Sequence, residues 1–130
     1  MEIKEQISSF KAMVNSYKLT NLIIASNNIG LFKILNEESQ SLEEISKELN
    51  ISENKIEPIL NGLVFNKIIR KNQTGYFLDE YKNVLLNNSE FNQTGYINFA
   101  QSLVTKYQKL ENAIKDTEFA ANNFKELTED

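Results

Sequence analysis

Three glutamates are among the side chains best suited to binding a ligand or taking part in a reaction. Glu43, Glu44 and Glu48 lie in one segment with helical spacing, where clustered carboxylates can bind a divalent cation. Spaced glutamates on a helix more often form a solvated face, so we assign no metal ligand. The chain has no Cys, His or Trp, which excludes thiolate nucleophiles, His-based triads and the usual zinc sites. We therefore assign no catalytic residue, and the absence of a Gly-rich turn leaves no cofactor-binding residue either.

A second candidate group is basic. Lys67, Arg70 and Lys71 could contact a phosphate, although a solvated hairpin is the commoner role of such a run. A net charge of −4 and a pI near 5.0 argue against a nucleic-acid partner. DNA reading would use a predicted helix over 53–65, whose outward positions carry one base among acids and amides: Glu53, Asn54, Lys55, Glu57 and Asn61.

Tyrosines form a third candidate group and could line a substrate entrance, although packing is their commoner role. They are Tyr76, Tyr81, Tyr96 and Tyr107.

A length of 130 residues with 41% apolar side chains predicts a single globular domain, 1–130. No stretch approaches the roughly 20 apolar residues of a membrane span, and the N-terminus lacks the pattern of a signal peptide. We expect a cytoplasmic protein without a membrane partner.

The N-terminal part, 1–35, is predicted to be helical. Apolar residues recur at steps of four and three over 3–17, as in an amphipathic helix: Ile3, Ile7, Phe10, Val14 and Tyr17. A second helix, over 19–29, is predicted to end at Asn28 and Gly30. Its apolar side is expected to hold Leu19, Leu22, Ile23, Ser26 and Ile29. A short apolar turn over 31–35 and a polar loop over 36–40 follow.

The central part, 41–79, predicts a winged helix. Ser41 and Glu44 have the spacing of a capping box, and the helix that they begin should end at Asn50. Ser52 is predicted to cap the next helix, which Pro58 should bend or delay, and Gly62 marks a close contact. Two β-prone runs around a polar turn then predict a hairpin at about 68–78. Helix, turn, helix and hairpin in this order are typical of a winged helix.

The last part, 80–130, is predicted to hold C-terminal helices and a linker. Asp79 can cap a short helix that ends at Leu86. A longer helix is predicted from a 3.5-residue apolar spacing over 96–114, formed by Tyr96, Ala100, Leu103, Tyr107, Leu110 and Ile114. The pentapeptide Asn-Gln-Thr-Gly-Tyr occurs at 72–76 and again at 92–96, which we interpret as coincidence.

The order and sequence of these segments resemble the N-terminal dimerisation domain of S-adenosylmethionine-dependent O-methyltransferases of the plant caffeate and bacterial natural-product type. The similarity is carried by Gly-Leu-Phe-Lys-Ile-Leu at 30–35 and by the Leu-Glu-Glu-Ile-Ser helix within 41–51. It continues through 60–69 and the hairpin end at 76–79. Asn66 stands where the family usually has Gly, which suits a left-handed helix end, and Asp79 replaces Thr or Ser, which suits a cap.

The resemblance implies a mainly α fold, a winged helix-turn-helix with a small β-hairpin flanked by N- and C-terminal dimerisation helices. It implies a non-catalytic homodimerisation domain that pairs subunits and helps wall an acceptor-substrate pocket. The chain alone would be no enzyme but a part of a methyltransferase, with residues 118–130 as the linker. S-adenosylmethionine would bind in a C-terminal Rossmann-like domain downstream. The alternative is a free-standing winged-helix transcriptional regulator that binds DNA.

The predicted partner is a second copy of the chain, because two amphipathic helices flank a core too small to cover both. The predicted interface residues are apolar and lie on these helices: Ile7, Phe10, Val14, Tyr17, Leu22, Ala100, Leu103, Tyr107, Leu110 and Ile114. On the simplest interpretation each stripe is an ordinary core face of a single subunit.

Overall fold

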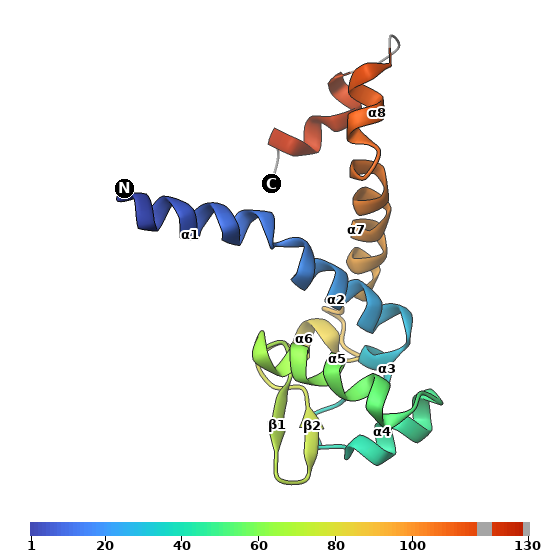
Figure 1. Cartoon of the computed structure of the whole chain (residues 1–130). Helices are drawn as coiled ribbons and strands as arrows, with labels where there is room; N and C mark the ends of the chain where they lie inside the picture. Colours follow the sequence, from blue (N-terminus) through green and yellow to red (C-terminus); the bar gives the residue numbers. More distant parts are fainter. Residues whose placement is uncertain (117–120, 129–130) are drawn as a thin grey trace. The chain divides into compact units, whose positions relative to one another are not determined.

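The computed structural model describes residues 1–116 and 121–128. The chain forms two compact units, Met1–Asn98 and Phe99–Asp130, and their boundary lies within helix α7 (Thr94–Tyr107). Most of the described chain is helical, and a small antiparallel sheet of two strands lies in the first unit (Figure 1). The predicted mainly α class with a small hairpin is therefore confirmed.

Three helices open the first unit: α1 (Ile3–Val14), α2 (Tyr17–Asn28) and α3 (Leu31–Ile34). Gly30, at φ +86°, makes the left-handed turn between α2 and α3, as its type predicted. The predicted apolar side of α2 was partly wrong. Ile24 and Ser26 are the buried residues, whereas Leu19 and Ile29 are exposed. Ile24 was missed because the apolar stripe was counted from Leu19, which lies near the exposed start of the helix.

Helix α4 (Leu42–Leu49) begins with the predicted capping box. The backbone N–H of Glu44 donates to the Ser41 hydroxyl at 3.1 Å, and the Ser41 N–H donates to the Glu44 carboxylate at 3.2 Å. Asn50, at φ +55°, ends the helix in the left-handed conformation. Sequence reasoning therefore located both ends of this helix.

Helix α5 (Glu53–Phe65) begins directly after Ser52, so of the two effects predicted for Pro58, a bend or a late start, the late start was wrong. The Ser52 hydroxyl donates to the Asn54 side-chain oxygen at 2.7 Å and does not cap the backbone. Pro58 lacks the N–H that would bond to the Asn54 carbonyl, but the helix continues because its apolar side is buried in the core. The left-handed residue that follows is Lys67, at φ +62°, and not Asn66 as predicted.

The hairpin consists of β1 (Arg70–Asn72) and β2 (Gly75–Phe77), paired with Lys71 opposite Tyr76. Gln40, in the segment predicted to be a loop, pairs with the far side of β2. Its N–H donates to the Tyr76 carbonyl at 2.9 Å, and the Tyr76 N–H donates to its carbonyl at 2.8 Å. Gly75, at φ +150°, permits this approach, since a Cβ there would lie 2.0 Å from the Gln40 carbonyl oxygen.

Helix α6 (Lys82–Leu85) follows, with Tyr81 at its N-cap position. Asp79 does not cap it, because its carboxylate instead accepts a hydrogen bond from Arg70 at 3.0 Å. The core of the first unit contains none of α1 and is formed by eleven side chains: Leu31, Phe32, Leu35, Ile45, Ile56, Leu60, Leu63, Ile69, Tyr76, Leu78 and Leu85.

The second unit contains the end of α7, helix α8 (Leu110–Lys115) and the 3₁₀ helix η1 (Ala121–Thr128). The single helix predicted over 96–114 was wrong, because the helical pattern of backbone hydrogen bonds is interrupted between the end of α7 and the start of α8. The Lys109 N–H there bonds to the Lys106 carbonyl, three residues back rather than four, at 3.1 Å. Of the predicted linker, residues 118–120 and 129–130 lie outside the described part of the chain.

Candidate functional site

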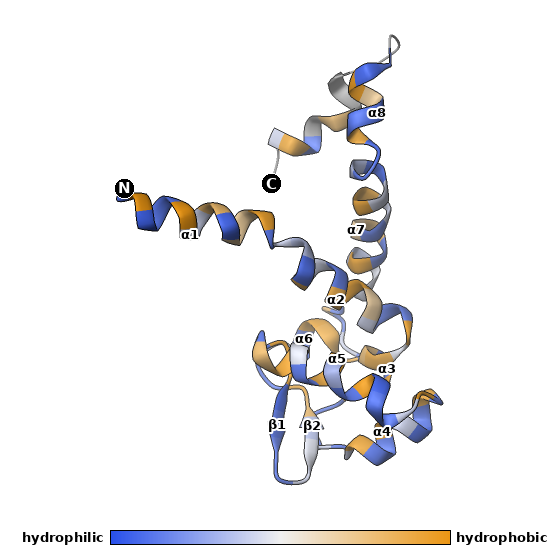
Figure 2. Cartoon of the chain, in the orientation of Figure 1, coloured by the Kyte–Doolittle hydropathy of each residue, from blue (hydrophilic) through white to orange (hydrophobic). Residues whose placement is uncertain are grey.

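The candidate interface begins with the apolar face of α1. Every residue of this helix is solvent-exposed in the first unit. Phe10 is 64% exposed, and Ile7 and Val14 are each more than half exposed. The helix predicted over 3–17 ends at Val14, so Tyr17, also more than half exposed, begins α2 instead. Figure 2 shows hydrophobic positions recurring along α1 between hydrophilic ones. The structure thus places three of the ten predicted interface residues on one uncovered helical face.

An uncovered face of this kind is unusual for a short helix. A helix of 12 residues is marginal alone in water, and most helical stability in proteins comes from packing an apolar face against a neighbour. Within the described residues of its own unit, α1 has no such neighbour, since it buries no residue. The α1 face is therefore suited to binding another apolar surface.

Leu22, on α2, has a different position from the other predicted interface residues. It is half-buried and packs against the core of its own unit. Its methyl carbon Cδ2 lies 3.1 Å from the point where a Cβ on Gly62 would stand, which confirms the close contact predicted at that glycine. Leu22 thus contributes to intrachain packing, and its role in an interface remains a prediction.

The C-terminal candidates are divided between two helices. Ala100, Leu103 and Tyr107 lie on α7 and are half-buried, whereas Leu110 and Ile114 lie on α8. Ile114 is 61% exposed. Because the ladder breaks between the two helices, the 3.5-residue spacing does not continue as one straight seam. Their part in an interface remains a prediction.

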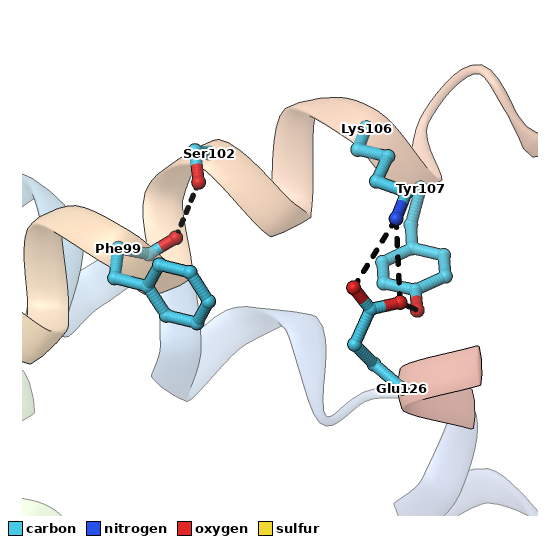
Figure 3. Close-up of polar contacts among 5 residues, drawn as sticks. All are labelled: Phe99, Ser102, Lys106, Tyr107 and Glu126. Carbon is cyan, nitrogen blue, oxygen red and sulfur yellow. Dashed lines mark hydrogen bonds and ion pairs between the residues drawn. The ribbon is translucent and has the colours of Figure 1, made fainter. Parts of the chain in front are cut away.

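A polar cluster joins α7 to η1 within the second unit. The Tyr107 hydroxyl donates to the Glu126 carboxylate at 2.9 Å, and the Lys106 ammonium lies 3.3 Å from both Glu126 oxygens. The rings of Tyr107 and Phe124 stand 5.5 Å apart, with the Lys106 nitrogen 4.8 Å from the Phe124 centroid. Figure 3 shows Glu126 facing both Lys106 and Tyr107. It also shows the hydrogen bond from the Ser102 hydroxyl to the Phe99 carbonyl, earlier in α7.

These contacts change two acid–base equilibria. Partial burial, and then the hydrogen bond to Glu126, raise the pKa of Tyr107 above its ordinary 10.0. A backbone hydrogen bond at Glu126, followed by the bond from Tyr107, lowers the pKa of that carboxyl below its ordinary 4.5. The prediction of a linker over 118–130 gave Glu126 no role, and the only signal available was the large apolar residues nearby, Phe119, Phe124 and Leu127.

The four candidate tyrosines do not form one site. Tyr76 is buried in the core, and Tyr107 belongs to the polar cluster of the second unit. Tyr81 and Tyr96 border an apolar hollow of about 260 Å³ in the first unit. Its other lining residues are Ile23, Phe32, Ile68, Val84, Leu85, Gln93 and Ile97. The hollow is therefore suited to an apolar side chain or ligand.

The three candidate glutamates behave as a solvated helix face. Glu43 pairs with Lys47 at 3.2 Å, while Glu44 completes the capping box. Within residues 1–116 and 121–128, no group of three or more acidic side chains could hold a metal ion.

The outward positions predicted on α5, from Glu53 to Asn61, are exposed as expected. No described helix has the length and apolarity that crossing a bilayer requires.

Comparisons with solved structures identify the fold. A human N-acetylserotonin methyltransferase, solved in complex with SAM, matches 89% of this chain with 14% identity and a TM-score of 0.74. An O-methyltransferase family protein from Burkholderia thailandensis matches 85% with 11% identity and a TM-score of 0.75. This chain has the fold of an O-methyltransferase N-terminal domain. The resemblance found from the sequence is thereby confirmed.

An O-methyltransferase family 2 protein from Planctomyces limnophilus, solved with apigenin, has higher identity over a shorter stretch. It shares 32% identity over 62% of this chain, with a TM-score of 0.56. The chain spans 35% of the human structure, 33% of the Burkholderia structure and 25% of the Planctomyces one. No protein-family model matches the chain, and no curated protein matches it by sequence.

Proposed function

We propose that this chain is a non-catalytic homodimerisation domain of an S-adenosylmethionine-dependent methyltransferase. The observation that carries the proposal is the apolar face of α1, none of whose residues is buried. The fold shared with part of several O-methyltransferases supports the enzyme class. Cofactor binding and methyl transfer belong, on this proposal, to a Rossmann-like domain outside these residues.

A symmetric pair would cover the exposed apolar face of α1. In a two-fold pair the same surface covers its counterpart, so each apolar contact is made twice. A stable interface covers about 800 Å² on each partner, which is more than one short helix supplies. On this proposal the half-buried apolar residues of α7 and the exposed Ile114 of α8 would supply the further area. The proposed interface therefore uses helices from both ends of the chain.

The hollow bordered by Tyr81 and Tyr96 supports the second part of the proposal, a wall of the acceptor pocket. Its lining is apolar apart from Gln93 and the two tyrosine hydroxyls, as expected for contact with a flat or greasy acceptor. The order α4, α5, β1, β2 supports a winged helix within the domain. The acceptor itself is not identified by these residues.

Sedimentation equilibrium over a range of protein concentrations tests the pairing directly. We expect a reversible dimer, and a monomer at all concentrations would refute the proposal. Leu103→Asp should have a larger effect on the free energy of dimerisation than on the unfolding free energy of the subunit. The matched change Val64→Asp should mainly destabilise the subunit, because Val64 packs on the core.

Two further measurements test the enzyme class and the alternative function. Calorimetry should give no heat on adding S-adenosylmethionine to this chain, and measurable binding would contradict the assignment of the cofactor site to another domain. DNA binding at physiological salt should be weak, because Glu53 and Glu57 are exposed on α5. Sub-micromolar, sequence-dependent affinity would favour a winged-helix regulator.

A further inference from the structure

An exposed phenylalanine marks a second surface, separate from α1. Phe65 is 84% exposed, more than any other large apolar side chain that the structure describes. It is the last residue of α5, in which Ile56, Leu60 and Leu63 are buried and Ile59 and Val64 are half-buried. Phe65 therefore adds nothing to the core of its own unit, and its position needs another explanation.

The turn after Phe65 holds a lysine where a glycine would fit better. The Lys67 N–H bonds to the Val64 carbonyl at 3.0 Å, and the Ile68 N–H bonds to the Leu63 carbonyl at 2.9 Å. This is a Schellman motif, in which the left-handed residue is usually glycine because a Cβ is disfavoured there. Lys67 occupies that position at φ +62°. The chain thus accepts backbone strain and presents a cation beside Phe65.

Lys67 borders a hollow of about 430 Å³ between the end of α5 and the hairpin. Val64, Lys67, Ile69, Arg70, Lys71 and Glu80 line it. Arg70 is already paired with Asp79, and the Lys71 nitrogen lies 5.1 Å from the centroid of the Tyr76 ring. Lys67 has no ion pair with any described residue. Two cations are therefore available to an incoming anionic group, against the single carboxylate of Glu80.

Strand β1 forms one edge of this surface. All three of its residues are exposed, and within the described chain it pairs with β2 alone, whereas β2 also pairs with Gln40. An unpaired edge can accept a further strand from another chain. The cations on β1 oppose pairing with a second β1 but favour a strand that carries negative charge.

We propose that Phe65, Lys67, Lys71 and the edge of β1 form a docking surface for an extended acidic peptide segment with an apolar side chain. Its carboxylates would pair with Lys67 and Lys71, its apolar side chain would cover Phe65, and its backbone would follow β1. A nucleic acid fits less well, because Glu53 and Glu57 are exposed on α5.

Fluorescence anisotropy with a labelled peptide of alternating Glu and Val around one Phe tests this surface on the full chain. We expect Lys67→Glu combined with Lys71→Glu to weaken binding about tenfold, as the loss of two exposed ion pairs would. Phe65→Ser should have an effect of similar size. The matched controls are Lys18→Glu with Lys33→Glu, and Phe91→Ser, all at exposed positions outside the surface. Circular dichroism verifies that each variant is folded.

Amide exchange separates edge pairing from simple charge attraction. Bound peptide should slow exchange at the backbone of β1. Equal losses in the control variants, or equal binding of a peptide with Lys in place of Glu, would overturn the proposal. It would also be overturned if β1 exchange were unchanged or if the peptide failed to bind. Tighter binding of mixed-sequence duplex DNA than of the acidic peptide would show instead that the surface contacts nucleic acid. None of these outcomes depends on whether the chain dimerises.

Discussion

Truncating Phe10 is the most direct test of the α1 face. Full burial of a phenylalanine side chain stabilises by up to about 3 kcal/mol, and Phe10 is 64% exposed. Allowing for the Cβ that alanine keeps, Phe10→Ala should remove about 1.5 kcal/mol for each copy. In a two-fold pair the loss occurs twice, giving about 3 kcal/mol, or a roughly hundredfold larger dissociation constant. The subunit should lose no stability, because α1 buries no side chain.

Phe91→Ala is the matched control. Phe91 is 61% exposed, lies between α6 and α7, and is not among the predicted interface residues. Sedimentation equilibrium should give a much weaker dimer for Phe10→Ala and an unchanged one for Phe91→Ala. Because unfolding of a dimer depends on protein concentration, unfolding curves of the variants need to be compared at concentrations where both are monomeric.

Two results would refute the reasoning. Equal dissociation constants for the two variants would show that Phe10 is outside the interface. A loss of several kcal/mol in the unfolding free energy of the Phe10→Ala monomer would show that α1 packs within its own subunit in solution.

Three further changes test local features of the fold. Ser41→Ala should lower the unfolding free energy by about 1 kcal/mol, measured by urea unfolding, since it removes the capping box of α4; an unchanged midpoint would contradict the cap. Gly75→Ala should cost roughly 3 kcal/mol, whereas Gly95→Ala, with nothing near its Cβ, should stabilise α7 by about 0.5 kcal/mol. Finally, tyrosinate absorbance should show that the pKa of Tyr107 is lower in Glu126→Gln than in the unchanged chain, because the Glu126 carboxylate accepts the hydrogen bond that holds the phenol proton. Since Glu126 has a lowered pKa, the contact should be present above its ordinary 4.5 and be lost as pH falls through the lower folded value; a variant with unchanged tyrosine titration would contradict the pairing.

Features set by neighbouring residues were predictable from the sequence. The capping box at Ser41 and the helix ends at Asn50 and Gly30 each depend on a few adjacent residues, and all three occur as predicted. The hairpin was predicted for the same reason, because its turn residues stand between β-prone runs. The exposed apolar face of α1 was also visible in the spacing, although only the structure shows that its own unit leaves it uncovered.

Features set by distant residues were not predictable. The pairing of Gln40 with Tyr76 joins a polar loop to a strand 36 positions later, and no local pattern marks it. The contact of Tyr107 with Glu126 likewise spans 19 residues. Asp79 had the right type for a cap, but its carboxylate binds Arg70 across the hairpin instead. In each case a tertiary contact decided between locally acceptable alternatives.

The repeated pentapeptide separates these two levels within one molecule. In both copies the asparagine side-chain oxygen accepts from the threonine N–H at 2.9 Å and also from the threonine hydroxyl, so the same five residues form the same turn. After the turn the copies diverge, because Gly75 and Tyr76 enter β2 whereas Gly95 and Tyr96 enter α7. Tyr76 pairs with Gln40 and is buried, while Tyr96 remains 65% exposed at the apolar hollow. Local sequence therefore specifies the turn in this chain, and the partner available to the next residue decides between strand and helix.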